Sequence, residues 1–260
     1  MGSASRVALT AAKAAVGKTS GLSVATGVAL LDAGRAIGNS PALRGALSNR
    51  VADASAKGAL VAATLGKVDA SALSLLTVLV GETWSSANEL LDGIEEIGIR
   101  VIAQSSKDDI ETELFAVGRA VAAHTELELS LNSKRGSAEA KTKLVASVLK
   151  GLSEATSAIV GHLVSAPRGR RIRNLLSNAE AIVADQRGRG VAVVTVAQPL
   201  DAAQRDRVAG ILSTRYNREH HIDEIVDVDI LGGFTIQVGN DTIDASIRSR
   251  LTELSSKLAG

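Results

Sequence analysis

The chain has 260 residues, 45% of them hydrophobic, which is enough for two ordinary domains with buried cores. Its 29 basic and 28 acidic side chains nearly cancel, and only 2% of its residues are aromatic. This composition excludes a protein that holds nucleic acid through its overall charge, and it leaves few rings for stacking on bases. The absence of cysteine excludes disulfides and thiolate metal sites, and it fits a reducing compartment.

The N-terminal stretch predicts an amphipathic helix rather than a signal peptide. It carries Arg6 and Lys13 and has no apolar core that a cleavage site could bound. The most apolar window, residues 73–80, is much shorter than the ~20 residues of a membrane-spanning helix. We therefore expect a cytoplasmic protein that reaches a membrane only through a partner.

Helical spacing of apolar residues continues from residue 3 to about residue 187, and only Pro41 and Pro167 interrupt it. Residues 73, 76 and 80, for example, place Leu, Leu and Val on one helix face, with Asp69 as a plausible N-cap. The sequence therefore predicts that this part of the chain is all helix.

The helical part contains an internal repeat, because residues 84 positions apart match without a gap (Leu31 and Phe115, for example). Asp69 and Ser153, both suited to cap a helix, also correspond. The other matching pairs are Leu30/Leu114, Gly34/Gly118, Arg35/Arg119, Ala36/Ala120, Ala56/Ala140, Lys57/Lys141, Leu60/Leu144, Val61/Val145, Ala62/Ala146, Leu65/Leu149, Leu79/Leu163 and Val80/Val164. We predict two copies over roughly 24–103 and 108–187. A chance likeness between helices rich in Ala and Leu is the alternative.

The composition changes at residues 187–190, where a domain boundary is expected. A β-branched run at 191–196 predicts a strand, which Pro199 ends. Beyond it we predict a helix at 201–216, strands at 222–229 and 234–238, and a last helix at 244–258. The predicted fold class is mainly α: a duplicated helical bundle array followed by a small α/β domain. The predicted domains are 1–104, 105–187 and 188–260.

Gly232 and Gly233 could belong to a phosphate-binding loop or to a tight turn between strands. A phosphate loop leads into a helix N-terminus, whose amides meet the anion. A strand is predicted after these glycines, so we favour the turn, in which glycine supplies a positive φ or close backbone packing.

Three groups of side chains are candidates for other sites. His220 and His221 are adjacent on a predicted strand, so they point to opposite faces and are expected to be exposed rather than to share a metal ion. The basic run of Arg168, Arg170, Arg171 and Arg173 is expected to be a solvated helix face, with a patch for an acidic partner, lipid headgroups or nucleic acid as the alternative. Trp84 aligns with Arg168 and suits either a core or an interface.

No catalytic motif is evident in the sequence. A nucleophile needs an oriented base beside it, and the remaining histidines, His124 and His162, lie in helical segments without a motif around them. We therefore predict no catalytic, cofactor-binding or metal-binding residues, and a protein that is not an enzyme.

The C-terminal segment from Ile222 to Leu254 resembles the C-terminal signature of the delta subunit of bacterial F-type ATP synthase (the OSCP/delta family). That signature has two glycines flanked by apolar residues, a polar residue and a glycine further on, and an Asp-x-Ser pair that opens the last helix. The matching residues are Gly232, Gly233, Gln237, Gly239, Asp244 and Ser246. His220, Val228 and Ala245 depart from the family's usual apolar residue, Pro and Gly. Residues 40–49 also resemble a turn in the family's N-terminal bundle.

This resemblance implies a non-catalytic stator subunit at the cytoplasmic face of the bacterial cell membrane. Its N-terminal bundle would grip the N-terminal helices of the alpha subunits, and its C-terminal domain would hold the b subunits of the peripheral stalk, with no cofactor and no nucleic acid. From order along the chain, we expect the first copy, preceded by an extra helix at 3–17, to take the alpha segment. The alternative function is a helical-repeat adaptor unrelated to ATP synthase.

Overall fold

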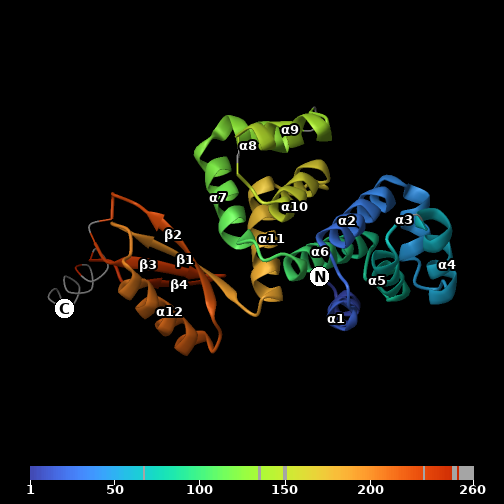
Figure 1. Ribbon diagram of the computed structural model, residues 1–260, viewed down its shortest axis with the longest axis horizontal. Helices are drawn as coiled ribbons and strands as arrows, with labels where there is room; N and C mark the ends of the chain where they lie inside the picture. The colour runs from blue at the N-terminus through green and yellow to red at the C-terminus, as the bar shows by residue number, and fades with distance from the viewer. Residues whose placement is uncertain (67, 134–135, 149–150, 231, 248–250, 252–260) are drawn as a thin grey trace, which may run out of the picture. The chain divides into compact units, whose positions relative to one another are not determined.

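The computed structural model describes residues 1–66, 68–133, 136–148, 151–230, 232–247 and 251. The chain divides into two compact units, residues 1–183 and 184–260. The first unit is helical, and the second contains the β-sheet (Figure 1). Mainly helical structure with a small α/β part at the C-terminus confirms the predicted fold class. None of the helices in the described part of the chain combines the length and the apolar character that a membrane span requires.

The helical part consists of α1 (Ser3–Lys18), α2 (Val24–Asn39), α3 (Pro41–Ser48), α4 (Ala54–Leu65), α5 (Ala70–Gly81), α6 (Ala87–Ser105), α7 (Ile110–Ala123), α8 (Thr125–Asn132), α9 (Ala138–Val148), α10 (Glu154–Ser165) and α11 (Ile172–Gln186). Side-chain caps set several of these starts. Asp69 accepts a hydrogen bond from the Ala72 amide, and Ser153 accepts one from the Thr156 amide. Both predicted caps are therefore confirmed.

The helix bounds repeat at the same spacing of 84 residues as the sequence. α3 starts at residue 41 and α8 at 125, and both are eight residues long. α5 covers 70–81 and α10 covers 154–165. By the same displacement α1 falls on α6, and α6 falls on α11. The helix at 3–17 is therefore not an extra element before the first copy, as predicted, but the equivalent of α6.

Helix α6 belongs to both copies, which we call the first bundle (α1–α6) and the second bundle (α6–α11). One apolar core runs from Ala8 to Val101, and the other combines Leu31 and Ile99 with residues as far as Val183. Ile94 and Ile97 on α6 enter the first core, whereas Ile99 and Ile102 enter the second. The predicted domain limit between 104 and 105 stays a prediction, but a cut there would separate α6 from half of the core that it supports.

Helices α2 and α6 pack side by side at very short range (Figure 1). A Cβ atom added to Gly27 would lie 2.8 Å from the carbonyl oxygen of Gly98. Only hydrogen can occupy that position without moving backbone, so glycine is required at this crossing. The first bundle is thereby fixed against the helix that starts the second.

The C-terminal unit contains a four-stranded sheet in the order β2-β1-β3-β4. Its elements are β1 (Gly190–Val196), α12 (Ala202–Tyr216), β2 (His220–Val226), β3 (Phe234–Val238) and β4 (Asp241–Asp244). β1 pairs with β2 in parallel and with β3 in antiparallel orientation, and α12 is the crossover between β1 and β2. Val194, Leu212 and Ile236 are fully buried between α12 and one face of the sheet.

Two predictions for this unit need correction. The strand predicted at 222–229 is β2, which begins and ends earlier, at His220 and Val226. Asp244, predicted to open the last helix, is the final residue of β4, a strand that the sequence analysis missed. Because β4 has only four residues, with Thr242 and Ile243 between two aspartates, its pattern is too short to detect. Most of the predicted helix at 244–258 lies outside the described residues.

Candidate functional site

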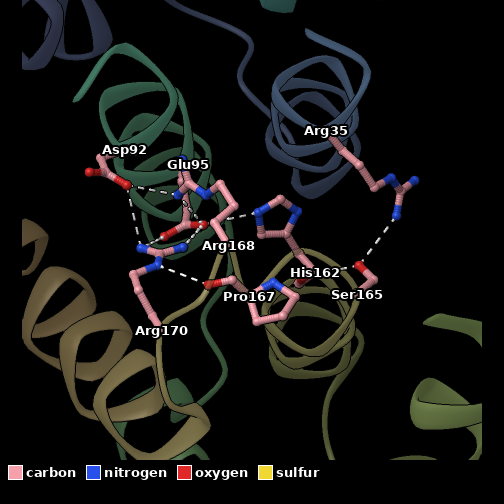
Figure 2. A network of polar contacts seen from close by, with 8 residues as sticks. All are labelled: Arg35, Asp92, Glu95, His162, Ser165, Pro167, Arg168 and Arg170. Atoms are coloured by element: carbon pink, nitrogen blue, oxygen red, sulfur yellow. Dashed lines mark hydrogen bonds and ion pairs between the residues drawn. The ribbon is translucent and has the colours of Figure 1, made fainter. Parts of the chain in front are cut away.

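A buried carboxylate on α6, Glu95, is the centre of the candidate site (Figure 2). Glu95 is 4% exposed. Arg168 donates to its Oε2 atom at 2.8 Å, and Arg170 donates to Oε1 and Oε2, each at 2.8 Å. His162 Nε2 lies 3.3 Å from Oε2. A bidentate guanidinium contact of this kind is the strongest geometry for an Arg–carboxylate pair.

A second carboxylate, Asp92, lies one turn earlier on α6 and completes what we call the glutamate cluster: Asp92, Glu95, His162, Arg168 and Arg170. Asp92 Oδ1 is 2.9 Å from Arg168 Nη2 and 3.5 Å from Arg170 Nη1. Its side chain keeps 41% exposure, whereas that of Glu95 keeps 5%. The deep carboxylate is therefore held by three partners, and the outer one balances the remaining guanidinium charge.

The pKa values of the two carboxyl groups are shifted in opposite directions. Burial by itself would raise the pKa of Glu95, but hydrogen bonds from His162 and Arg170 and the charges of both arginines outweigh it and lower the pKa to about 2. Burial raises the pKa of Asp92, and the two arginines offset this only in part. Glu95 is thus a permanent buried anion at neutral pH.

A tight turn before α11 carries both arginines. Arg168 has a φ of +48° and Gly169 a φ of +79°, two successive left-handed residues. The Arg170 amide donates to the Pro167 carbonyl oxygen at 2.9 Å, which closes the turn. A non-glycine residue in this region costs about 1 kcal/mol, so the contacts of Arg168 with α6 hold it there.

The expectation for the basic run is therefore wrong. α11 begins only at Ile172, so Arg168 and Arg170 are not on a helix face, and they are half-buried and paired with carboxylates of α6. Arg171 and Arg173 are exposed, and Arg173 Nη1 lies 4.0 Å from Glu128 Oε2. Such a surface does not support the alternative of a nucleic-acid or headgroup patch.

A cavity of about 730 Å³ opens beside the cluster, wholly within the helical unit. Its walls are the end of α2, the start of α3, α6, the end of α10 and the turn at residues 166–170. Arg35 and Arg44 add two further guanidinium groups to the lining. Among the described residues, no group of three or more His, Cys, Asp and Glu side chains is placed to hold a metal ion.

The other candidates from the sequence lie elsewhere. Trp84 is 2% exposed and donates from Nε1 to the Leu79 carbonyl oxygen at 2.7 Å, so it is a core residue. His124 joins α7 to α8. His220 and His221 are half-buried rather than exposed, because α12 and β1 flank β2, and His221 lies 3.4 Å from the buried Asp223. The prediction that they are exposed is wrong.

Gly232 and Gly233 lie in the connection from β2 to β3, as predicted, but β1 lies between these strands in the sheet, so the connection is not a tight turn between neighbouring strands. Their φ values are +139° and +81°, and a Cβ on Gly233 would lie 2.4 Å from the Ala245 carbonyl oxygen. The remaining signature residues surround it on the last two strands: Gln237 on β3, Gly239 with φ +57° in the β3–β4 turn, and Asp244, whose Oδ1 accepts from the Ser246 amide. Their functional role stays a prediction.

Sequence reasoning missed Glu95 and Asp92, although the repeat contains a signal for them. In the 84-residue register, Asp92, Glu95, His162 and Arg168 replace Ala8, Ala11, Val78 and Trp84. Single replacements of this kind are common on exposed faces. Four polar replacements at positions that are apolar in the other copy indicate instead a set that interacts.

The fold and the site define a class of protein: a double helical bundle built on one shared helix, followed by a small α/β unit. The model of the family described as "ATP synthase delta (OSCP) subunit" matches residues 100–258 of the chain. "ATP synthase subunit delta" of Leifsonia xyli is 44% identical over 264 residues, covering 100% of both chains. The protein of that name from Streptomyces coelicolor is 36% identical over 84% of this chain and 82% of its own. The chain therefore belongs to the ATP synthase delta (OSCP) subunit family.

One solved structure is also similar. A chain in the cryo-EM structure of the Toxoplasma gondii mitochondrial ATP synthase hexamer has a TM-score of 0.38 and 18% identity, covering 64% of this chain and 96% of that chain. At this level the likeness carries no conclusion about fold or function.

Proposed function

We propose that the chain is a non-catalytic stator subunit of the F-type ATP synthase. It would link the alpha subunits of the catalytic head to the b subunits of the peripheral stalk, so that rotation is coupled to proton flow and ATP synthesis. The observation that carries this proposal is the match to the delta family, together with a relative of that name that is 44% identical over the full chain. In the complex, the subunit would lie peripherally at the cytoplasmic face of the bacterial cell membrane.

The structure supports a mechanical role for the helical part. A connector must resist torque, and packed interiors transmit strain rather than absorb it. Because α6 contributes to both cores, a load on one bundle reaches the other through a single continuous helix. The glycine contact between α2 and α6 removes side chains that could rearrange at this crossing.

The family match changes which bundle we assign to the alpha subunit. It begins at residue 100 and covers α7–α11, but it leaves α1–α5 outside. The second bundle is therefore the better candidate for gripping alpha N-terminal helices in a groove between helices, and the first bundle for lengthening the connector. This replaces the assignment made from order along the chain.

Depletion of the chain from membranes tests the proposed function. ATP hydrolysis by the head should then continue without driving proton transport, and adding back the full chain should restore coupling. Proton transport that persists at full strength after depletion contradicts the stator role. The full chain is required because a cut near residue 104 would remove α6 from the second core.

Copurification separates the stator from an unrelated helical-repeat adaptor. A stator subunit should leave the membrane together with the catalytic head during low-salt washing. An adaptor with another partner should stay behind or leave independently. The outcome needs no knowledge of the contact surface.

A further inference from the structure

The cavity beside the glutamate cluster has an excess of positive charge. Four guanidinium groups line it, against the carboxylates of Asp92 and Glu95. Both carboxylates are engaged with Arg168 and Arg170. The charges of Arg35 and Arg44 are therefore not balanced from within the cavity.

Arg44 is the cation with the least compensation. Its Nη1 donates to the Gly38 carbonyl oxygen at 3.3 Å, and it forms no ion pair with any residue that the structure describes. Arg35 pairs at 2.7 Å with Asp32, which does not line this cavity, and reaches Ser165 only at 3.4 Å. A half-buried guanidinium that faces a cavity without an anion attracts a negatively charged ligand.

A second observation points to a ligand at the same wall. His162 is 9% exposed, and its Nδ1 atom is buried without a hydrogen-bond partner. Buried polar atoms normally find a partner, so this unpaired ring nitrogen, in a residue that lines the cavity, marks an incomplete polar network at this wall. The glutamate cluster occupies the other ring nitrogen, and this fixes the orientation of the ring.

The lining also limits what kind of anion fits. Leu31 and Leu91 contribute apolar surface, and the amides of Asn39 and Asn88 contribute neutral polar groups. A free inorganic anion would leave the leucines without a contact. A peptide segment, which carries apolar side chains next to a carboxylate, matches both kinds of surface.

We propose that this cavity binds an acidic segment of a partner protein, with a carboxylate of the partner held by Arg44. The inference rests on the proposed function, because it takes the partner to be another subunit of the same complex. It goes beyond that function by naming a recognition site between the two bundles and the chemistry of its ligand. The first bundle would then supply Arg35 and Arg44 to a site that the second bundle alone lacks.

Binding of short overlapping peptides from the soluble subunits of the complex to the full chain tests the proposal. At least one peptide containing Asp or Glu should bind. Arg44→Gln should weaken that binding about 10- to 100-fold, and changing the acidic residue of the peptide to its amide should do the same. The matched control is Arg171→Gln, which removes an exposed charge outside the cavity and should leave the affinity unchanged.

A charge exchange distinguishes loss of the ion pair from misfolding of the variant. Arg44→Glu should lose the wild-type peptide but bind the same peptide with Lys at its acidic position. Emission of Trp84, the only tryptophan, reports whether the first bundle is folded in each variant. No acidic peptide bound, equal weakening by Arg171→Gln, or inorganic phosphate binding in place of peptide would each overturn the proposal.

Reconstitution with the catalytic head distinguishes a wrong function from a wrong binding site. If the wild-type chain does not rejoin the head, the proposed function is wrong. If it rejoins the head and Arg44→Gln does so with equal affinity, only the proposed site is wrong. If Arg44→Gln weakens assembly and Arg171→Gln does not, both stand.

Discussion

The two bundles share a helix and have the same order of helices, but they carry different residue types at one set of equivalent positions. In the first bundle, the first and fifth helices carry Ala8, Ala11 and Val78 at these positions, and Trp84 follows the fifth helix. In the second, the equivalent positions are Asp92, Glu95, His162 and Arg168, which form the glutamate cluster. The same scaffold therefore accepts either an apolar contact or a buried ion cluster at one place.

The two positions also differ in the space around them. Trp84 fills its position completely: a Cβ added to Gly93 would lie 2.1 Å from the indole ring. Arg168 reaches past the equivalent position to α6, and the space beside it stays open. Since a buried ion cluster is seldom more stabilising than apolar packing of similar volume, the second bundle gives up stability where it gains a charged cavity.

The same face differs between α6 and α1. On α6, the face covered by α2 includes Leu91, Ile94 and Ile102. The equivalent residues of α1 are Val7, Thr10 and Lys18, all exposed. This face of α1 is therefore not covered by a helix as it is on α6.

Replacing Trp84 with Ala should give the largest loss of stability, because it empties the apolar closure of the first bundle. Truncation of a large buried aromatic ring costs about 4 kcal/mol in the free energy of unfolding. Urea unfolding followed by circular dichroism measures it. Trp84→Phe, which keeps most of the ring, should lose less than half as much. A loss below about 1 kcal/mol for Trp84→Ala would show that the ring is not part of the core.

Glu95→Gln should be the next most damaging change, because it leaves two guanidinium groups and His162 without their common anion. Breaking a buried pair from one side typically costs 3–5 kcal/mol, and Arg168 and Arg170 are partly hydrated, so we expect about 3 kcal/mol. Urea unfolding is again the measurement. Glu139→Gln, an exposed change on α9, is the matched control and should stay within about 0.5 kcal/mol of the wild type.

Acid should act on the second bundle through the same carboxylate. The pKa of Glu95 falls from 4.5 to about 2 on folding, so the folded state binds fewer protons than the unfolded state. The stabilisation is complete above about pH 4.5 and is lost as the pH falls toward 2, up to about 3 kcal/mol. Unfolding free energies across this range should fall less steeply in Glu95→Gln. An equal slope in both proteins would show that Glu95 does not titrate with folding.

The sequence was informative wherever a pattern was local or repeated. Helical spacing and the 84-residue register predicted the helices, and the caps Asp69 and Ser153 lie where expected. The β-branched run predicted β1. Each of these signals depends on residues close together in the chain, or on a comparison of the chain with itself.

The candidate site could not be read in the same way, because its parts are distant in sequence. Glu95 and Arg170 are 75 positions apart, and their contact depends on the turn at Arg168 and Gly169. A basic run was interpreted as exposed because most such runs are. The sequence signal for a buried cluster was the replacement of four apolar residues of one copy by polar residues in the other. Without the fold, nothing shows that these four positions lie close together.

The smallest expected effect on stability concerns a glycine–threonine contact that occurs in both bundles, with the two residues on opposite helices of the pair. Between α4 and α5, Gly58 faces Thr77: a Cβ on the glycine would lie 3.1 Å from the threonine methyl group. Between α9 and α10, at the equivalent positions, Thr142 faces Gly161, with 3.8 Å for the same measurement. One small and one β-branched residue are thus paired in both bundles, in opposite order.

Gly58→Thr should therefore crowd Thr77 and cost about 1 kcal/mol, despite the better helix propensity of threonine. Gly58→Thr combined with Thr77→Gly copies the arrangement of the second bundle and should recover part of this loss. The coupling energy from a double-mutant cycle of urea unfolding measures it, and about 1 kcal/mol of favourable coupling is expected. Additive effects would mean that the exchange between the bundles is not a compensated contact, and that the two copies diverged independently on these helices.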